Sequence, residues 1–146
     1  MVIREMKSSD VSEIAKLEVM CFSDPWSEKS IASELDNRLS YWLVAEEDGV
    51  VVGYVGSQSV LDSADMMNIA VAPTYRRKGV GKMLINALTD HLVQKRIRFL
   101  LLEVRISNTS AIALYKGMGF EQVGKRPRYY HNPREDALIL RKELCE

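Results

Sequence analysis

The sequence predicts a single α/β domain, 1–146, with a mixed central sheet of about six to seven strands and helices on both faces. Three observations support this prediction. Residues 67–104 read as strand, loop, helix and strand, a crossover unit whose two strands should be parallel. Paired β-rich runs before and after that unit indicate antiparallel hairpins. A chain of 146 residues also buries enough surface for a core without disulfides.

The N-terminal part predicts a strand and then a helix. Residues 2–6 alternate as a short strand should. Asp10 followed three residues later by Glu13 resembles a capping box, so a helix should start there and end at Cys21, before Pro25. The residues expected on its inward stripe are Ile14, Leu17, Val19 and Met20.

A second helix should follow directly. Ser27 is a good N-cap residue, and Asn37 should end the helix. Ile31 and Leu35 are four residues apart, so they would share its inner face.

Three strands are expected next. Residues 41–47 and 50–59 are β-rich and are joined through Asp48-Gly49, a strong signal for a hairpin. Residues 66–71 continue the sheet up to the crossover loop.

The second half of the chain completes the crossover and closes the sheet. Residues 80–95 should form a helix, because apolar side chains recur at every fourth position, at Val80, Leu84, Leu88 and Leu92. Residues 99–104 are apolar except for Glu103, a pattern typical of a strand buried on both faces. The remaining elements are a helix at 110–118 ended by Gly119 and a hairpin of 121–130 and 136–141.

Composition limits the partners of the chain. Its 20 Lys and Arg residues balance 20 Asp and Glu residues, which gives no support for direct nucleic-acid or membrane-surface binding. Cys21 and Cys145 are far apart and are expected to be reduced thiols. We therefore expect a cytoplasmic protein without a signal peptide or membrane span. No group of His, Cys, Asp and Glu has the spacing of metal ligands, so we predict no metal.

The loop at residues 72–81 is the most informative segment. Between a strand and a helix it places Arg76, Arg77 and Lys78 beside Gly79 and Gly81. Backbone N–H groups freed at such a junction, together with the helix dipole, favour a guest with two or more phosphates. A Walker A loop and a Rossmann fingerprint are both excluded by the glycine spacing. The alternative is a basic surface turn with a glycine kink.

Two further residues are candidates for proton transfer. Glu103 is a lone carboxylate in an apolar strand, unfavourable by several kcal/mol unless it is paired or neutralised. It is either a general base, a partner of Arg105 or another cation, or exposed at the strand end. Tyr115 follows Ala111 and Ile112 on an inward helical stripe, so it is either an acid or an ordinary core tyrosine.

Several motifs together resemble the GNAT acetyltransferase superfamily. Ala72 to Gly81 is similar to its acetyl-CoA diphosphate loop. The strings at 101–105, at 108–115 and at 129–130, with Asp24-Pro25-Trp26-Ser27, resemble the RimI-type branch. Its members are bacterial enzymes that acetylate the N-terminal alanine of a small-subunit ribosomal protein. The resemblance covers the chain from about residue 3 to residue 140.

This resemblance implies acetyl-CoA as co-substrate and a protein N-terminus as acceptor. It implies Glu103 as the base, Tyr115 as the acid, and Trp26 and Tyr130 as contacts of the acceptor peptide. The main chain of the strand before the loop would bind the pantetheine arm and the thioester oxygen. The residues implied in cofactor binding are Ile69, Ala70, Val71, Arg76, Arg77, Lys78, Gly79, Val80, Gly81, Lys82 and Asn108.

Two alternatives to this function stay open. The same chemistry could serve a lysine side chain, a polyamine or another small amine. The chain could also be a CoA-binding module without turnover, although a degenerate module need keep neither Glu103 nor Tyr115. We expect a monomer or a weak homodimer.

Overall fold

The computed structural model describes residues 1–144, so Cys145 lies outside the described residues. Within them a single sheet runs in the order β1-β2-β3-β4-β5-β7-β6. The helices and strands are β1 (Val2–Glu5), α1 (Val11–Cys21), α2 (Glu28–Glu34), β2 (Ser40–Glu47), β3 (Val50–Val60), β4 (Ser63–Val71), α3 (Val80–Gln94), β5 (Phe99–Arg105), α4 (Thr109–Gly117), β6 (Glu121–Tyr130) and β7 (Glu135–Glu143). Two 3₁₀ turns, η1 (Ser8–Asp10) and η2 (Pro73–Tyr75), precede α1 and α3.

The sheet is mixed, as predicted. β4 and β5 are parallel and are connected through α3, while every other described pair of strands is antiparallel. The hairpin of β2 and β3 turns at Asp48 and Gly49, whose φ angles of 51° and 80° are the left-handed values that a two-residue hairpin turn needs.

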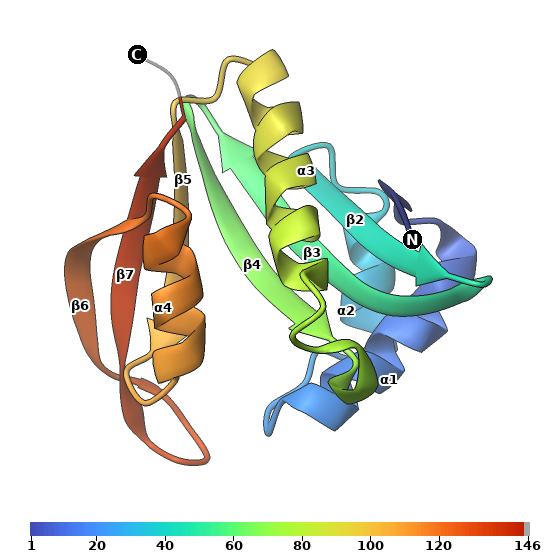
Figure 1. Ribbon diagram of the computed structural model, residues 1–146, viewed down its shortest axis with the longest axis horizontal. Helices are drawn as coiled ribbons and strands as arrows, with labels where there is room; N and C mark the ends of the chain where they lie inside the picture. Colours follow the sequence, from blue (N-terminus) through green and yellow to red (C-terminus); the bar gives the residue numbers. More distant parts are fainter. Residues whose placement is uncertain (145–146) are drawn as a thin grey trace.

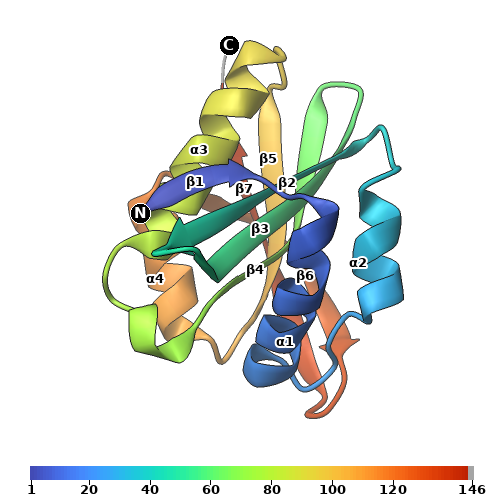
Figure 2. The same cartoon turned by 90° about the vertical axis from the view of Figure 1, so that its right-hand side faces the viewer.

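Helices cover both faces of the sheet, which confirms the predicted layers. Figure 2 shows α1 and α2 on one side of the sheet and α3 and α4 on the other. The larger core lies under α3 and α4, where Val80, Leu84, Leu88 and Leu92 are all buried. The smaller core lies under α1 and α2 and includes Ile14, Ile31, Trp42 and Tyr54.

The inward stripe of α1 differs from the prediction. Ile14 and Leu17 are buried, but Val19 and Met20 are 69% and 60% exposed. Glu18 takes the inward position instead, at 1% exposure. Helical geometry explains the change, because residues spaced by three and four share a face and Val19 and Met20 fall outside it. Likewise α2 ends at Glu34, so Leu35 lies beyond the helix and is 38% exposed.

The predicted capping box at Asp10 is wrong, whereas the cap at Ser27 is confirmed. The Asp10 carboxylate accepts hydrogen bonds from the Arg4 guanidinium, at 2.8 and 2.9 Å, and from the Lys7 amide, at 2.7 Å. It therefore closes the η1 turn and ties it to β1, and makes no capping bond to α1. Ser27 Oγ accepts the Ser30 N–H at 3.1 Å, as an N-cap should.

Candidate active site

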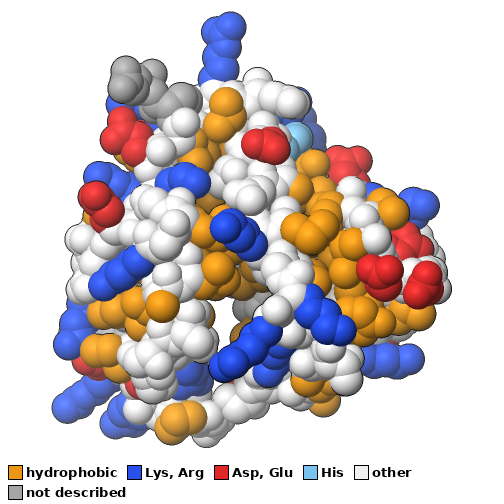
Figure 3. All heavy atoms as spheres, in the orientation of Figure 1, with side chains coloured by type: hydrophobic (Ala, Val, Ile, Leu, Met, Phe, Trp, Pro, Cys, Tyr) orange, Lys and Arg blue, Asp and Glu red, His pale blue; other side chains and the backbone are white. Residues whose placement is uncertain are grey.

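A wedge opens in the sheet where β4 and β5 diverge. The last pair that joins them is Met66–Leu102, although β4 continues to Val71 and β5 to Arg105. A register shift against β3 leaves Met67 as an extra residue in β4 at the same level, and such a bulge increases local twist. Figure 1 shows the two strands separating, and Figure 3 shows a hollow there with Lys and Arg side chains along its border.

Consecutive free amides follow β4 at the mouth of this wedge. The N–H groups of residues 77–79 donate to no other described residue, and those of 80–82 belong to the unpaired first turn of α3. The first helical bond there runs from the Met83 N–H to the Gly79 carbonyl, at 3.0 Å. Gly79 and Arg77 have φ angles of 79° and 62°. Left-handed residues in such a run form an anion-binding concavity, so the loop can accept phosphate oxygens.

The basic side chains of this loop do not all point outward. Arg76 donates through Nε to the Val71 carbonyl, at 3.1 Å, and through Nη2 to Cys21 Sγ, at 3.3 Å. The Lys78 ammonium lies over the Tyr75 ring, 5.4 Å from its centre. Arg76 thus links the loop to β4 and α1. Contacts of Arg76, Arg77 and Lys78 with phosphate stay a prediction.

Glu103 lies on β5, one residue beyond the last pair with β4. Its Oε1 pairs with Arg126 Nε of β6 at 3.1 Å, and its Oε2 is buried without a hydrogen-bond partner among residues 1–144. The predicted cation partner therefore exists, but it is Arg126, because Arg105 pairs with Glu135 at 3.2 Å. One carboxylate oxygen stays free to accept a proton or a hydrogen bond.

β5 is buried on one face only, which corrects the sequence prediction. Leu100, Leu102 and Val104 point into the core under α3 and α4. Leu101 and Glu103 point to the other face and are half-buried, because the smaller core under α1 and α2 includes side chains of β2, β3 and β4 but none of β5. The Glu103 side chain is 28% exposed on this face.

Aromatic and basic side chains of β6 surround the Glu103 carboxylate. Burial, followed by the carboxylate of Glu103, raises the pKa of the Tyr129 hydroxyl. Burial raises the pKa of Tyr130 to about 12, with Glu103 as the next cause and Arg105 acting in the opposite direction. The Arg105 guanidinium stacks on the Tyr130 ring, 4.4 Å from its centre. Both phenols therefore stay protonated at neutral pH and can donate hydrogen bonds.

Tyr115 of α4 lies on the opposite side of β5, in the larger core. It packs edge to face on Phe120, with ring centres 5.7 Å apart. Burial raises the pKa of its hydroxyl to about 12. The hydroxyl has no hydrogen-bond partner among the residues that the structure describes, so its proton is available to a ligand.

The other predicted cofactor residues lie around the wedge. The side chain of Ala70 is buried, and those of Ile69 and Val71 are half-buried, so they are core side chains as expected. Their main chain pairs with β3 on one side and has no strand on the β5 side. Asn108 Oδ1 accepts the Ala111 N–H at 3.3 Å and caps α4. Cofactor contacts of these residues stay predictions.

Trp26 packs on the smaller core. Its ring meets Trp42 edge to face at 5.5 Å, and its backbone N–H donates to Glu18 Oε1 at 2.8 Å. Packing explains this tryptophan without a substrate, so its role as a peptide contact stays a prediction.

Glu18 is a buried residue that sequence reasoning missed. The signal for it was its place in the stripe of Ile14 and Leu17, where an apolar residue is the rule.

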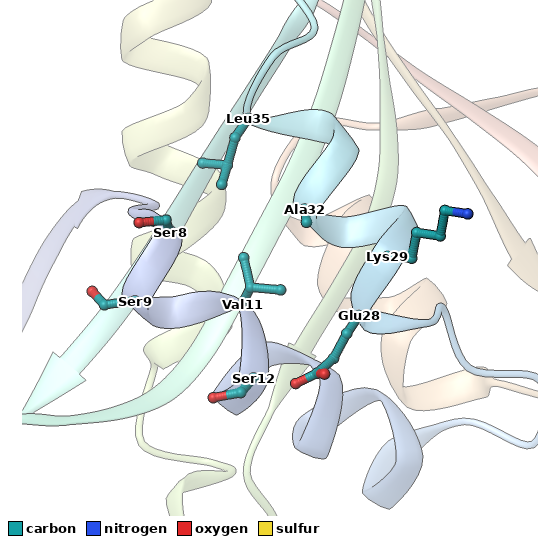
Figure 4. Close-up of a pocket in the computed structure, with 8 residues that line it drawn as sticks. All are labelled: Ser8, Ser9, Val11, Ser12, Glu28, Lys29, Ala32 and Leu35. Atoms are coloured by element: carbon teal, nitrogen blue, oxygen red, sulfur yellow. The ribbon is translucent and has the colours of Figure 1, made fainter.

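A separate pocket of about 510 Å³ lies between the start of α1 and α2. Figure 4 shows Ser8, Ser9 and Ser12 on one side of it and Lys29 and Ala32 of α2 on the other. None of its lining residues belongs to the predicted site.

Across residues 1–144 there is no group of three or more His, Cys, Asp and Glu side chains that could hold a metal. The helices in that part of the chain are all too short or too polar to cross a membrane.

The mixed sheet with its wedge and amide-rich loop has counterparts among known proteins. The model of the acetyltransferase (GNAT) family matches residues 11–120, most of the chain. The chain belongs to the GNAT acetyltransferase family. The predicted fold, family and acyltransferase class are therefore confirmed.

Relatives of this GNAT chain share a more specific name. It is 38% identical over 141 residues to the [ribosomal protein bS18]-alanine N-acetyltransferase of Escherichia coli K12, covering 94% of each chain. It is 35% identical over 143 residues to the Haemophilus influenzae protein of the same name, covering 95% of this chain and 96% of the relative. The crystal structure of the Escherichia coli ribosomal-protein-S18-alanine N-acetyltransferase superposes with a TM-score of 0.92, covering 99% of this chain and 94% of that one at 35% identity.

Proposed function

We propose that this enzyme transfers the acetyl group of acetyl-CoA to the α-amino group of a protein N-terminus, an alanine of a small-subunit ribosomal protein. The observation that carries the proposal is the Oε2 of Glu103, an oxygen without a described hydrogen-bond partner on the half-buried face of β5, beside a wedge with an amide-rich mouth. The names of relatives at 38% identity support the alanine acceptor. An acceptor of this kind places the enzyme in the cytoplasm.

The wedge suits a long, thin acyl carrier. The pantetheine arm would lie like an added strand along the edge of β4 at Ile69, Ala70 and Val71, where β4 no longer pairs with β5. The diphosphate would accept hydrogen bonds from the amides of residues 77–82, which have no other described acceptor. Arg77 and Lys82 are exposed cations nearby that can approach the remaining phosphate. No metal is needed for these contacts.

The reaction starts with removal of a proton from the acceptor. An α-ammonium group has a pKa of about 7.7–8.0, so most of it is protonated at neutral pH. Glu103 would take this proton directly or through a water. The free amine then attacks the thioester carbon. The Ile69 N–H of β4, which donates to the neighbouring Asn68 Oδ1 at 3.2 Å, would hold the developing oxyanion in place of that side chain.

Collapse of that adduct breaks the carbon–sulfur bond. Tyr115 is protonated, because burial raises its pKa to about 12, and would donate its proton or a hydrogen bond to the leaving thiolate. Trp26 and Tyr130 are the proposed contacts of the acceptor peptide. We expect the enzyme to act as a monomer or weak homodimer without contacting nucleic acid.

Mass spectrometry of peptides incubated with acetyl-CoA tests the proposal. One peptide begins with a free alanine, a second has the same sequence with a blocked N-terminus and an internal lysine, and a small amine is the third acceptor. We expect acetylation of the first peptide at its α-amino group. Acetylation of only the lysine or the small amine would replace the proposed acceptor, and acetyl-CoA binding without any product would indicate a module without turnover.

A further inference from the structure

Glu18 of α1 is a buried carboxylate that the reaction described above does not use. Its side chain is 1% exposed, and no ion pair among residues 1–144 involves it. Oε1 accepts the Trp26 N–H at 2.8 Å, and Oε2 accepts the side-chain amide of Asn68. Burial raises its pKa, and the two hydrogen bonds act in the opposite direction.

The two donors come from separate segments of the chain. Trp26 belongs to the segment between α1 and α2. Asn68 lies in β4, beyond its last pair with β5, and its Oδ1 accepts the N–H of Ile69 at 3.2 Å. One carboxylate therefore links a proposed peptide contact to the stretch of β4 proposed to hold the thioester.

Fold stability alone does not explain a carboxylate here. The neighbouring stripe residues Ile14 and Leu17 fill the same core with apolar side chains. A buried ion loses several kcal/mol of hydration, and an apolar residue of similar size is often neutral or better at such a site. A second requirement accounts for the carboxylate, which is to fix the geometry of the two segments that it bonds.

We propose that Glu18 is a positioning residue that sets the Trp26 segment and the Asn68–Ile69 edge of β4 in register for acetyl transfer. The inference rests on the proposed function, because it concerns the alignment of that acceptor with that thioester. Reactions between bound groups are sensitive to alignment, and a displacement of about 1 Å can lower the rate by about 100-fold.

Two variants separate this role from simple packing. Glu18→Gln keeps the shape and one acceptor oxygen, but its amide then faces a second donor, either Asn68 or Trp26. We expect the acceptor KM to rise and kcat to fall, with kcat/KM lower by about 10-fold or more. The KM for acetyl-CoA should change by less than about 3-fold, because the diphosphate amides at 77–82 are untouched.

The double variant Glu18→Gln/Asn68→Asp exchanges the roles of the two side chains. The amide introduced at position 18 would donate to the carboxylate introduced at position 68 and still accept the Trp26 backbone N–H, so the acceptor KM should return toward the wild-type value. The charge introduced beside the Ile69 N–H, the proposed oxyanion donor, should keep kcat low. Glu13→Gln is the matched control, because Glu13 on the same helix accepts the Val51 N–H at 3.2 Å, away from the wedge. We expect wild-type kinetics from it.

Hydrogen exchange of the Trp26 amide, measured by NMR, is a readout independent of activity. We expect faster exchange in Glu18→Gln and restored protection in the double variant. Wild-type kcat and KM in a Glu18→Gln variant that exchanges faster would overturn the proposal, as would a double variant whose acceptor KM is no lower than that of Glu18→Gln. Should Glu18→Gln not fold, Asn68→Ala removes the same link and must show the same rise in acceptor KM.

The wild-type enzyme is first assayed on the acceptor panel. If it accepts only another amine, the proposed acceptor fails, and the same variants measured with that amine still test Glu18.

Discussion

Replacing Glu103 by Gln removes one negative charge and keeps the size of the side chain. The change breaks the ion pair with Arg126, whose side chain is 55% exposed against 28% for Glu103. A pair this exposed contributes at most about 1 kcal/mol to the free energy of unfolding. Since Oε2 makes no hydrogen bond within residues 1–144, no further bond is lost. We expect the melting temperature to fall by no more than about 4 °C.

The effect on turnover should be far larger. A positioned general base contributes about 10²- to 10⁴-fold to the rate, so kcat should fall by that factor. The acetyl-CoA Kd should change by less than about 3-fold, because the carboxylate lies outside the diphosphate loop. Initial rates over both substrates, with titration calorimetry for acetyl-CoA, measure the two quantities separately.

Arg126→Gln is the matched control, because it breaks the same ion pair and keeps the carboxylate. We expect its kcat to stay within a few-fold of wild type. Two results would refute the reasoning. The first is a Glu103→Gln enzyme with wild-type turnover at every pH. The second is an Arg126→Gln enzyme as slow as Glu103→Gln, which would make the ion pair, and not the base, the source of the loss.

Three further predictions concern other parts of the molecule. Tyr115→Phe should leave the free energy of unfolding nearly unchanged, since the hydroxyl has no described partner, and should lower kcat by about 10-fold or more in stopped assays; an undiminished rate would return Tyr115 to a packing role. Gly79→Val should weaken acetyl-CoA binding in titration calorimetry for two reasons. A β-branched residue is strained at a φ of 79°, and its side chain would enter the space proposed for the phosphates, where no protein atom lies within 4 Å of the added Cβ. An unaltered Kd would contradict the loop assignment. Asp10→Asn should lower the free energy of unfolding by about 2 kcal/mol at pH 7 in urea titrations, because it weakens charge-assisted hydrogen bonds from Arg4. The Arg4 hydrogen bonds hold the pKa of Asp10 below its usual 3.8, so this stabilisation is complete above about pH 4 and disappears as the pH falls through the lower folded value; a difference that persists in acid would argue against it.

Local signals in the sequence predicted the fold well where the structure of a segment depends on its own residues and not on a distant partner. The fourfold spacing of Val80, Leu84, Leu88 and Leu92 requires only that one face of a helix be buried, and it is. Asp48-Gly49 turns a hairpin because both residues tolerate a positive φ. The free amides of the loop before α3 follow from its glycines and the helix start in the same way.

Predictions failed where the partner of a side chain lies far along the chain. Asp10 can cap α1 from sequence alone, but Arg4 on β1 offers a charged partner and takes the carboxylate. The single buried face of β5 depends on where α1 and α2 pack, which no local pattern records. Glu18 is the clearest example, since its donors Trp26 and Asn68 meet only in the folded chain.

A crystal structure of the complex with acetyl-CoA would decide whether the wedge and its loop form the active site. We expect diphosphate oxygens within about 3 Å of the amide nitrogens of residues 77–82, with the thioester in the wedge on the side of Glu103. A carrier bound elsewhere, or one whose acetyl group lies away from β5, would contradict this assignment.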